Sequence, residues 1–251
     1  MEAARSAVAG LLGAAPDTLT FTSGGTEANN LAIFGAAAAK ARGGRHIVTT
    51  AMEHPSVAAA CGQLEKEGWE VTRLVPDGSG CVPLSALEAA LRPDTMLVSM
   101  MLVNNELGNI YPIAEIARGL AVKNPQTLLH TDAVQGFLKV PFSAKALGAD
   151  FIAISGHKVG APKGIGALYI GPRVRNPRPL LPGGGQEMGL RSGTEATAQI
   201  AGFAKAVELR WDHLEDKLHH MAEVKAYAVE KLTAIPDLQI IGDGKAPHVL
   251  S

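Results

Sequence analysis

The chain has 251 residues, 47% of them hydrophobic, and a formal net charge of −1. This length and composition allow a large buried core without a disulfide framework or a structural metal ion. The near-zero charge indicates no polyanionic partner, so we expect neither nucleic-acid binding nor attachment to an acidic membrane surface. The two cysteines, Cys61 and Cys81, are isolated, and no apolar stretch approaches the length of a membrane span. We therefore expect a globular cytoplasmic protein.

The first residues, MEAARSAVAGLLGAAP, superficially resemble a signal peptide with a small-residue cleavage site. However, Glu2 lies where a signal peptide carries positive charge, and Val8, Leu11 and Leu12 have helical spacing. The segment is therefore predicted to be a helix and not a secretion signal.

Short apolar runs then alternate with amphipathic segments. The runs predict strands near 19–23, 46–50, 70–75, 95–103, 127–131, 150–155 and 165–170. The amphipathic segments predict helices over 25–42, 55–67, 84–92 and 112–122. Pro83 and Pro112 stand near the starts of the last two helices, where a missing N–H costs little. This alternation predicts an α/β fold, a mostly parallel seven-stranded sheet with helices on both faces.

The pattern changes after Thr194. Apolar residues at spacings of three or four predict a long helix to about Leu232, and a break near Trp211 is compatible with that pattern. After Pro236 the segment LQIIGD predicts one further strand. We therefore expect a large domain over 1–210 and, over 211–251, a connecting helix with the beginning of a small α+β domain.

Polar residues follow the ends of five predicted strands. Ligands of open parallel sheets bind at the carboxyl ends of the strands, so these residues are candidates for one site. In chain order they are Gly24 to Glu27, Glu53 and His54, Asn104 to Glu106, Asp132 and Gln135, and His157 and Lys158. One polar strand end would mean little, because caps and turns use the same residues, but five groups at one rim predict a site.

The residue types at this rim predict its chemistry. The TSGGTE turn leads into a helix N-terminus that suits a phosphate, although it has neither the P-loop lysine nor a GxGxxG pattern. Asp132, at the end of a buried strand, needs a cationic partner. Lys158, in a similar place, can become a neutral amine that forms a Schiff base with a carbonyl. Together with His54 as a stacking group, these parts indicate pyridoxal phosphate.

Each residue also has an ordinary structural explanation. His54 could simply open a helix before Pro55, and Lys158 could be a surface lysine. Turns or caps could account for Asp132, Asn104, Asn105, Ser155, His157 and Thr194. The common site is favoured because these explanations require several independent coincidences in the order that one cofactor needs. No His/Cys spacing resembles a metal site, and the pattern gives no role to His130, His219 or His220.

Several stretches closely resemble the cysteine desulfurases, within the class V group of fold-type I pyridoxal phosphate enzymes. They are FTSGGTEANNLAI, EHPSV, VNNELGNIYPI, HTDAVQ, SGHKVGAPKGIGALYI and GGGQEMGLRSGTE. On that resemblance Lys158 would bind the cofactor covalently, His54 would stack on its ring and Asp132 would pair with the ring nitrogen. The ring-oxygen side would be bound by Asn105 and Gln135, and the phosphate by Gly25, Thr26, Ser155 and His157. Thr194 would reach the phosphate of the partner subunit in a homodimer.

The resemblance implies a reaction of L-cysteine. Lys158 would act as base at Cα, and the products would be alanine and a protein persulfide. The sulfur would pass to an acceptor protein such as an iron–sulfur scaffold, or into thio-cofactor synthesis. Selenocysteine lyase and other class V aminotransferases are alternatives, and a non-catalytic module that binds cofactor or dimerises is an alternative of another class.

The sequence departs from this family at its ends. The YLDNAATT-like segment that usually precedes these motifs is absent, and the loop with the nucleophilic cysteine and the arginine for the substrate carboxylate would lie beyond Ser251. Cys61 falls on the apolar face of a predicted helix and Cys81 follows the turn DGSG, so neither matches that nucleophile. We therefore expect a fragment that cannot desulfurate cysteine by itself and whose spare apolar surface favours association.

Overall fold

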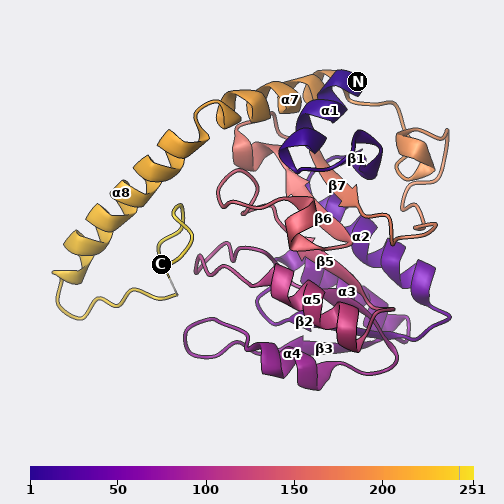
Figure 1. Ribbon diagram of the computed structural model, residues 1–251, viewed down its shortest axis with the longest axis horizontal. Helices are drawn as coiled ribbons and strands as arrows, with labels where there is room; N and C mark the ends of the chain where they lie inside the picture. The colour runs from indigo at the N-terminus through magenta and orange to yellow at the C-terminus, as the bar shows by residue number, and fades with distance from the viewer. Residues whose placement is uncertain (243) are drawn as a thin grey trace.

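A seven-stranded sheet forms the centre of the computed structural model, which describes residues 1–242 and 244–251. The strands are β1 (Leu19–Thr22), β2 (His46–Thr50), β3 (Glu70–Leu74), β4 (Thr95–Ser99), β5 (Leu128–Asp132), β6 (Phe151–Ser155) and β7 (Gly166–Ile170). Their order is β1-β7-β6-β5-β4-β2-β3; all neighbours from β6 to β3 are parallel, and β7 is antiparallel to both β1 and β6 (Figure 1). The predicted strands before Thr194 and the mostly parallel sheet are confirmed, except that the strand predicted over 95–103 ends at Ser99.

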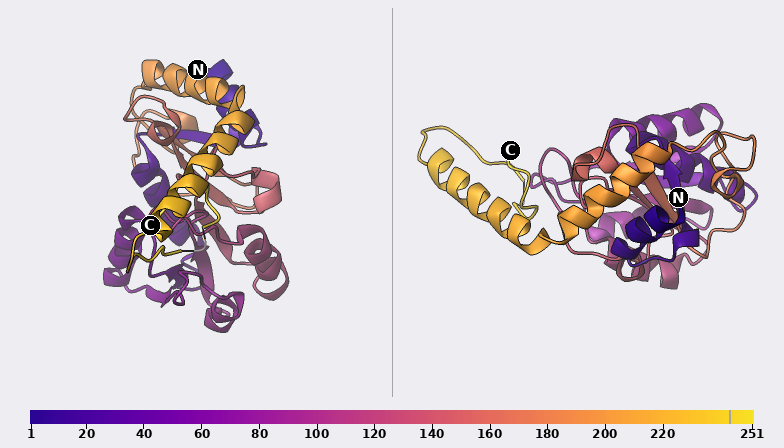
Figure 2. Two further views of the ribbon diagram at one scale, coloured as in Figure 1. Left: turned by 90° about the vertical axis from the view of Figure 1, so that its left-hand side faces the viewer. Right: turned by 90° about the horizontal axis from the view of Figure 1, so that it is seen from above.

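Helices cover both faces of this sheet, as predicted (Figures 1 and 2). α2 (Gly25–Lys40) and α3 (Pro55–Lys66) pack on one face, and α1 (Glu2–Leu11), α5 (Ile113–Lys123) and α7 (Thr197–Trp211) pack on the other. The remaining helices are α4 (Leu84–Ala90), α6 (Ala144–Leu147), α8 (Leu214–Thr233) and the 3-10 helices Pro16–Thr18, Gly156–Val159 and Glu187–Gly189. Pro83 and Pro112 are the N-caps of α4 and α5, close to their predicted positions.

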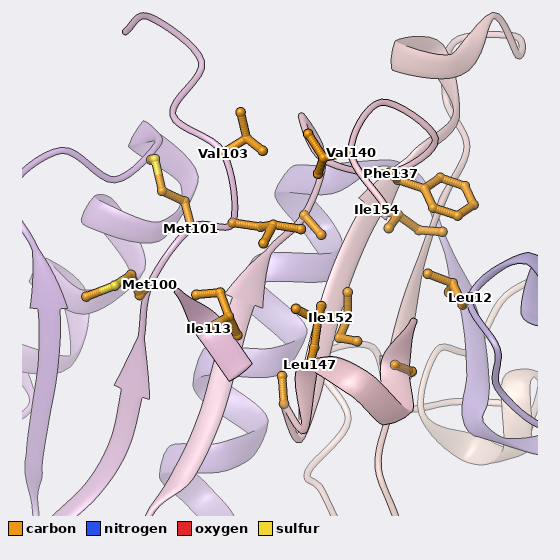
Figure 3. Packing of buried hydrophobic residues seen from close by; sticks show 14 of the residues in the cluster. Leu12, Met100, Met101, Val103, Ile113, Phe137, Val140, Leu147, Ile152 and Ile154 are labelled. Carbon is orange, nitrogen blue, oxygen red and sulfur yellow. The ribbon is translucent and has the colours of Figure 1, made fainter. Parts of the chain in front are cut away.

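Two hydrophobic clusters explain why the central strands are apolar along their whole length. Successive residues of a strand point to opposite faces, so Phe151 packs under α2 and α3 while Ile152 packs in the other cluster. Figure 3 shows Ile152 and Ile154 of β6 with Ile113 of α5 in this second cluster. The strands β2, β4, β5 and β6 are buried throughout, which is the pattern expected of parallel strands covered on both sides.

The C-terminal part differs from the sheet domain. The predicted long helix is broken after Trp211, because α7 ends there and α8 begins at Leu214. None of the residues of α8 is buried, and the helix extends away from the sheet (Figures 1 and 2). None of the described helices has the length and apolar character needed to cross a membrane. The division at residues 210 and 211 stays a prediction.

The predicted strand after Pro236 is wrong for the residues that the structure describes. Residues 238–242 form no strand, and Asp243, the last residue of that prediction, lies outside the described residues. The segment instead meets the end of the chain, where the Ile241 N–H donates to the Ser251 carbonyl at 2.9 Å. A strand needs a neighbouring strand edge for its backbone hydrogen bonds, and an apolar run cannot show whether that edge is present.

Candidate functional site

A cavity of about 230 Å³ lies at the carboxyl ends of the central strands. All the residues given a role by the family resemblance line it except Thr194: Gly25, Thr26, His54, Asn105, Asp132, Gln135, Ser155, His157 and Lys158. The other candidates from the strand ends do not line it: Gly24, Glu27, Glu53, Asn104 and Glu106. Thr194 is exposed outside this cavity, and it does not cap α7, whose N-cap is Ala196. Among the described residues no group of His, Cys, Asp and Glu is arranged to hold a metal ion.

The sheet topology brings these residues together. Asp132 is the last residue of β5 and Ser155 the last residue of its parallel neighbour β6, so both lie at the same edge of the sheet. A single 3-10 turn after β6 carries His157 and Lys158. Thr26 lies in the first turn of α2, and a Cβ on the neighbouring Gly25 would lie 3.5 Å from Ser155 Cβ, so this turn adjoins the end of β6.

One end of the cavity suits an anion. The first turn of α2 offers free backbone N–H groups, and its N-cap Gly24 has φ 150°, a conformation that favours glycine. Gly25 has no room for a side chain, because a Cβ there would lie 2.7 Å from a methyl group of Val134. Ser155 Oγ and His157 Nδ1 lie 2.9 Å apart beside this turn. Burial and the nearby lysines, Lys158 among them, lower the pKa of His157.

Asp132 supplies a buried carboxylate. Its Oδ1 accepts the N–H of Val134 at 2.9 Å, and its Oδ2 accepts Nδ2 of Asn29 at 2.7 Å. Burial raises the pKa of Asp132, while these two donors and the nearby His54 act in the opposite direction. A carboxylate held in this way at the rim of a cavity is suited to a cationic partner.

Two of the ordinary structural explanations also hold. His54 is the N-cap of α3, where its Nδ1 accepts the N–H of Ser56 at 3.2 Å, and it lines the cavity as well. Asn104 forms an Asx turn, because its Oδ1 accepts the N–H groups of Glu106 and Leu107 at 2.9 and 2.8 Å. Asn105 is thus the asparagine of this pair that faces the cavity.

The sequence analysis missed three further polar residues at or behind the cavity wall. Asn29 and Ser56 line it, and His130 lies behind Asn29, with its Nε2 3.1 Å from Asn29 Oδ1. A signal for His130 was present, because residues two apart in a strand share a face and His130 stands two before Asp132.

Lys139 is a further buried cation that was missed. It is 8% exposed, and its Nζ donates to Oε1 of Gln135 at 2.8 Å. Burial, together with the charges of Arg210 and Lys158, lowers the pKa of Lys139 to about 8. The hydrogen bond leaves the amide nitrogen of Gln135 as the donor available to the cavity.

The family model described as Aminotransferase class-V matches residues 1–251. The chain belongs to this family. A curated relative, cysteine desulfurase 2 of Trichormus variabilis, is 47% identical over 242 residues, which are 96% of this chain and 60% of the relative. The chain therefore spans about three fifths of the length of such curated relatives.

Solved structures agree with this family membership. The crystal structure of DndA from Streptomyces lividans has a TM-score of 0.91 and 41% identity, covering 99% of this chain and 71% of that one. A NifS-like protein has a TM-score of 0.93 and 38% identity, covering 98% of this chain and 67% of that one. Members of the class V family use pyridoxal phosphate, and the predicted fold-type I architecture is confirmed by these neighbours.

Proposed function

We propose that this chain is the cofactor-binding part of a pyridoxal phosphate-dependent cysteine desulfurase, which converts L-cysteine to alanine and transfers the sulfur. The observation that carries the proposal is that Lys158, Asp132 and the anion-binding turn of α2 line one cavity. The similarity of the chain to a relative named cysteine desulfurase 2 supports this choice of activity within the family.

The residues around the cavity fit the cofactor. Asp132 would pair with the ring nitrogen, because its carboxylate is buried and keeps acceptor capacity beside the two N–H groups that it already binds. Lys158 would bind the cofactor covalently, and His54 would stack on the ring. The remaining contacts would come from Asn105 and Gln135 at the ring oxygen and from Gly25, Thr26, Ser155 and His157 at the phosphate.

These residues would perform the first chemical step on L-cysteine. When bound, pyridoxal phosphate supplies an electron sink for the carbon atom from which a proton is removed. The amine of Lys158 would be released when the amine of L-cysteine takes its place, and it would then take the proton from Cα of the substrate, while His54 would move protons nearby. Asp132 would keep its charge next to the ring nitrogen and would orient the ring.

Further parts of this proposal concern the surroundings of the site. We infer a homodimer in which Thr194, exposed outside the cavity, reaches the phosphate held by the partner subunit. The sulfur would pass to an acceptor protein such as an iron–sulfur scaffold. The two free cysteines are compatible with the cytoplasmic location that we propose.

The experiment measures exchange of the Cα hydrogen. The chain is incubated with pyridoxal phosphate and L-cysteine in deuterated buffer, and loss of the Cα proton signal is followed by NMR. We expect exchange that is abolished in Lys158→Ala and about 100-fold or more slower in Asp132→Asn, since each removes a group that acts on that proton.

The matched control is Lys163→Ala, which removes a lysine from the same glycine-rich segment without changing the cavity lining. It should exchange at the rate of the unmodified chain. Equal exchange in the unmodified chain and in Lys158→Ala, or no exchange in any of them, would contradict the proposed function.

A further inference from the structure

We propose that Asn29 is a positioning residue that links Asp132 to His54 through Ser56 and holds His54 in the tautomer with its proton on Nε2. This inference rests on the proposed function for the role of the two linked residues. The hydrogen bonds that support it join side chains of this chain and involve no cofactor atom.

Asn29 is the branch point of a buried hydrogen-bond network. It lies on the inner face of α2 and is 1% exposed. Its Nδ2 lies 2.7 Å from Asp132 Oδ2 and 2.9 Å from Ser56 Oγ, and its Oδ1 lies 3.1 Å from His130 Nε2. The side-chain amide therefore meets three polar side chains from β5 and α3 at once.

His130 is compatible with one direction of the network at its far end. It is completely buried, and burial lowers its pKa to about 3, so the ring is neutral and has a single N–H. The Nδ1 atom lies 2.8 Å from Ser99 Oγ and can accept its hydroxyl proton. The ring proton is then on Nε2, where it is donated to Oδ1 of Asn29.

Asp132 fixes the same direction independently. An ionised carboxylate only accepts hydrogen bonds, so the Asn29 atom beside Asp132 Oδ2 must be the amide nitrogen. The second proton of that nitrogen is then directed to Ser56 Oγ. Asp132 thus assigns the orientation of the Asn29 amide, and His130 with its proton on Nε2 is compatible with it.

Ser56 transmits this orientation to His54. Its hydroxyl oxygen accepts from Asn29, so the single hydroxyl proton remains for His54 Nδ1, 2.8 Å away. The backbone N–H of Ser56 also donates to this Nδ1 at 3.2 Å. With two donors directed at it, Nδ1 cannot carry a proton of its own, and the proton of neutral His54 is on Nε2.

Reversing the network would require several simultaneous changes. A proton on Nδ1 of His54 would face the N–H of Ser56, and the Ser56 hydroxyl oxygen would have to accept from both His54 and Asn29, which leaves its own proton with neither partner. If the Ser56 hydroxyl proton turned to Asn29 instead, the amide of Asn29 would have to present its oxygen to Asp132, which only a protonated carboxyl group could tolerate. The charge of Asp132 and the tautomer of His54 are therefore coupled, and His54 presents Nε2 as a proton donor and not as a base.

The test reads the tautomer directly. The chain is labelled with ¹⁵N in the histidine rings and studied without added cofactor at about pH 8, above the ordinary histidine pKa of about 6.5. Long-range ¹H–¹⁵N correlation spectra distinguish protonated from unprotonated ring nitrogens, and His54→Gln and His130→Gln assign the signals. We expect an unprotonated Nδ1 and a protonated Nε2 for both His54 and His130.

Variants then test the link through Asn29. Asn29→Ala should convert His54 to a mixture of tautomers, although Asn29 does not contact His54, because it frees the Ser56 hydroxyl to accept or donate. Ser56→Ala should change His54 while leaving His130 as it was, and it keeps the proposal testable if Asn29→Ala does not fold. Asn30→Ala, on the same helix, is the control and should change neither ring, since Nδ2 of Asn30 donates to the backbone carbonyls of Thr26 and Ser56 and not to the side chains of the network.

A His54 signal with its proton on Nδ1, or a His54 signal unchanged in folded Asn29→Ala, would overturn the inference. Both results are read in the chain without cofactor. Failure here therefore leaves the Cα exchange test of the proposed function unaffected, and failure of that test leaves the tautomer intact.

Discussion

Glu53, next to the cavity residue His54, is buried, with 8% of its surface exposed. Its Oε1 accepts hydrogen bonds from Thr50 Oγ1 and from the N–H of Met101, both at 2.9 Å, while Oε2 has no hydrogen-bond partner among the described residues. Burial raises the pKa of Glu53 from 4.5 to about 8. The folded state therefore binds this proton more tightly than the unfolded state, and stability falls as the pH rises between these two values.

This shift predicts a pH-dependent effect of Glu53→Gln. The amide cannot ionise, so the variant and the unmodified chain should have similar stability at about pH 5, whereas at about pH 9 the variant should be more stable by roughly 4 kcal/mol. Urea unfolding at both pH values measures the difference. A difference of the same size at both pH values would show that Glu53 does not titrate in this range.

At the scale of single residues, the sequence predicted those cavity residues that lie at the carboxyl ends of parallel strands. Asp132, Ser155 and Lys158 come at or just after the ends of parallel strands, and such ends meet at one edge of a sheet. Asn29 and His130 were missed because a polar residue within a helix or strand has many possible partners. Their role depends on which faces meet in three dimensions.

At the scale of elements, a buried ion pair connects α1 and β1 with the loop that carries Thr194. The two terminal nitrogens of Arg5 donate to the two carboxylate oxygens of Glu187 at 2.8 Å each, and Nη1 also donates to the Leu19 carbonyl at 2.7 Å. Glu187 additionally accepts the N–H of Phe21 at 2.7 Å. Both side chains are almost fully buried.

Glu187→Gln should destabilise the fold, because it removes the buried countercharge of the Arg5 guanidinium and leaves the exposed Glu2 at 4.0 Å. The expected loss is about 3 kcal/mol in the free energy of unfolding. The matched control is Glu65→Gln, which breaks the solvent-accessible bidentate pair with Arg73 and should cost less than about 1 kcal/mol. Equal losses in the two variants, measured by urea unfolding, would contradict this account of the buried pair.

The strands and helices of the sheet domain could be predicted because their apolar patterns are local. Two errors have a physical cause. The predicted strand 95–103 ends at Ser99, because residues 100–103 stay apolar and buried after the regular ladder has finished. The strand predicted after Pro236 fails because strand formation depends on a partner edge, which is a property of the whole fold.

At the scale of the whole molecule, the sheet domain and the segment after Trp211 differ in how much they bury. Large apolar side chains are exposed on and near α7 and α8, including Leu209, Trp211, Val224 and Tyr227 at 51%, 52%, 53% and 63%. Such surface commonly marks an interface, so association of this region stays a prediction. The cavity, by contrast, is built within the sheet domain, from α2, α3 and the ends of the strands.

The most direct test of the central claim is covalent capture of the cofactor. The chain is incubated with pyridoxal phosphate, reduced with borohydride and digested, and the peptides are mapped by mass spectrometry. We expect one pyridoxyl group, on Lys158, because its amine lines the same cavity as Asp132 and the anion-binding turn. A label on Lys163 or Lys139, or labelling spread over surface lysines, would contradict the assignment of this cavity as the cofactor site.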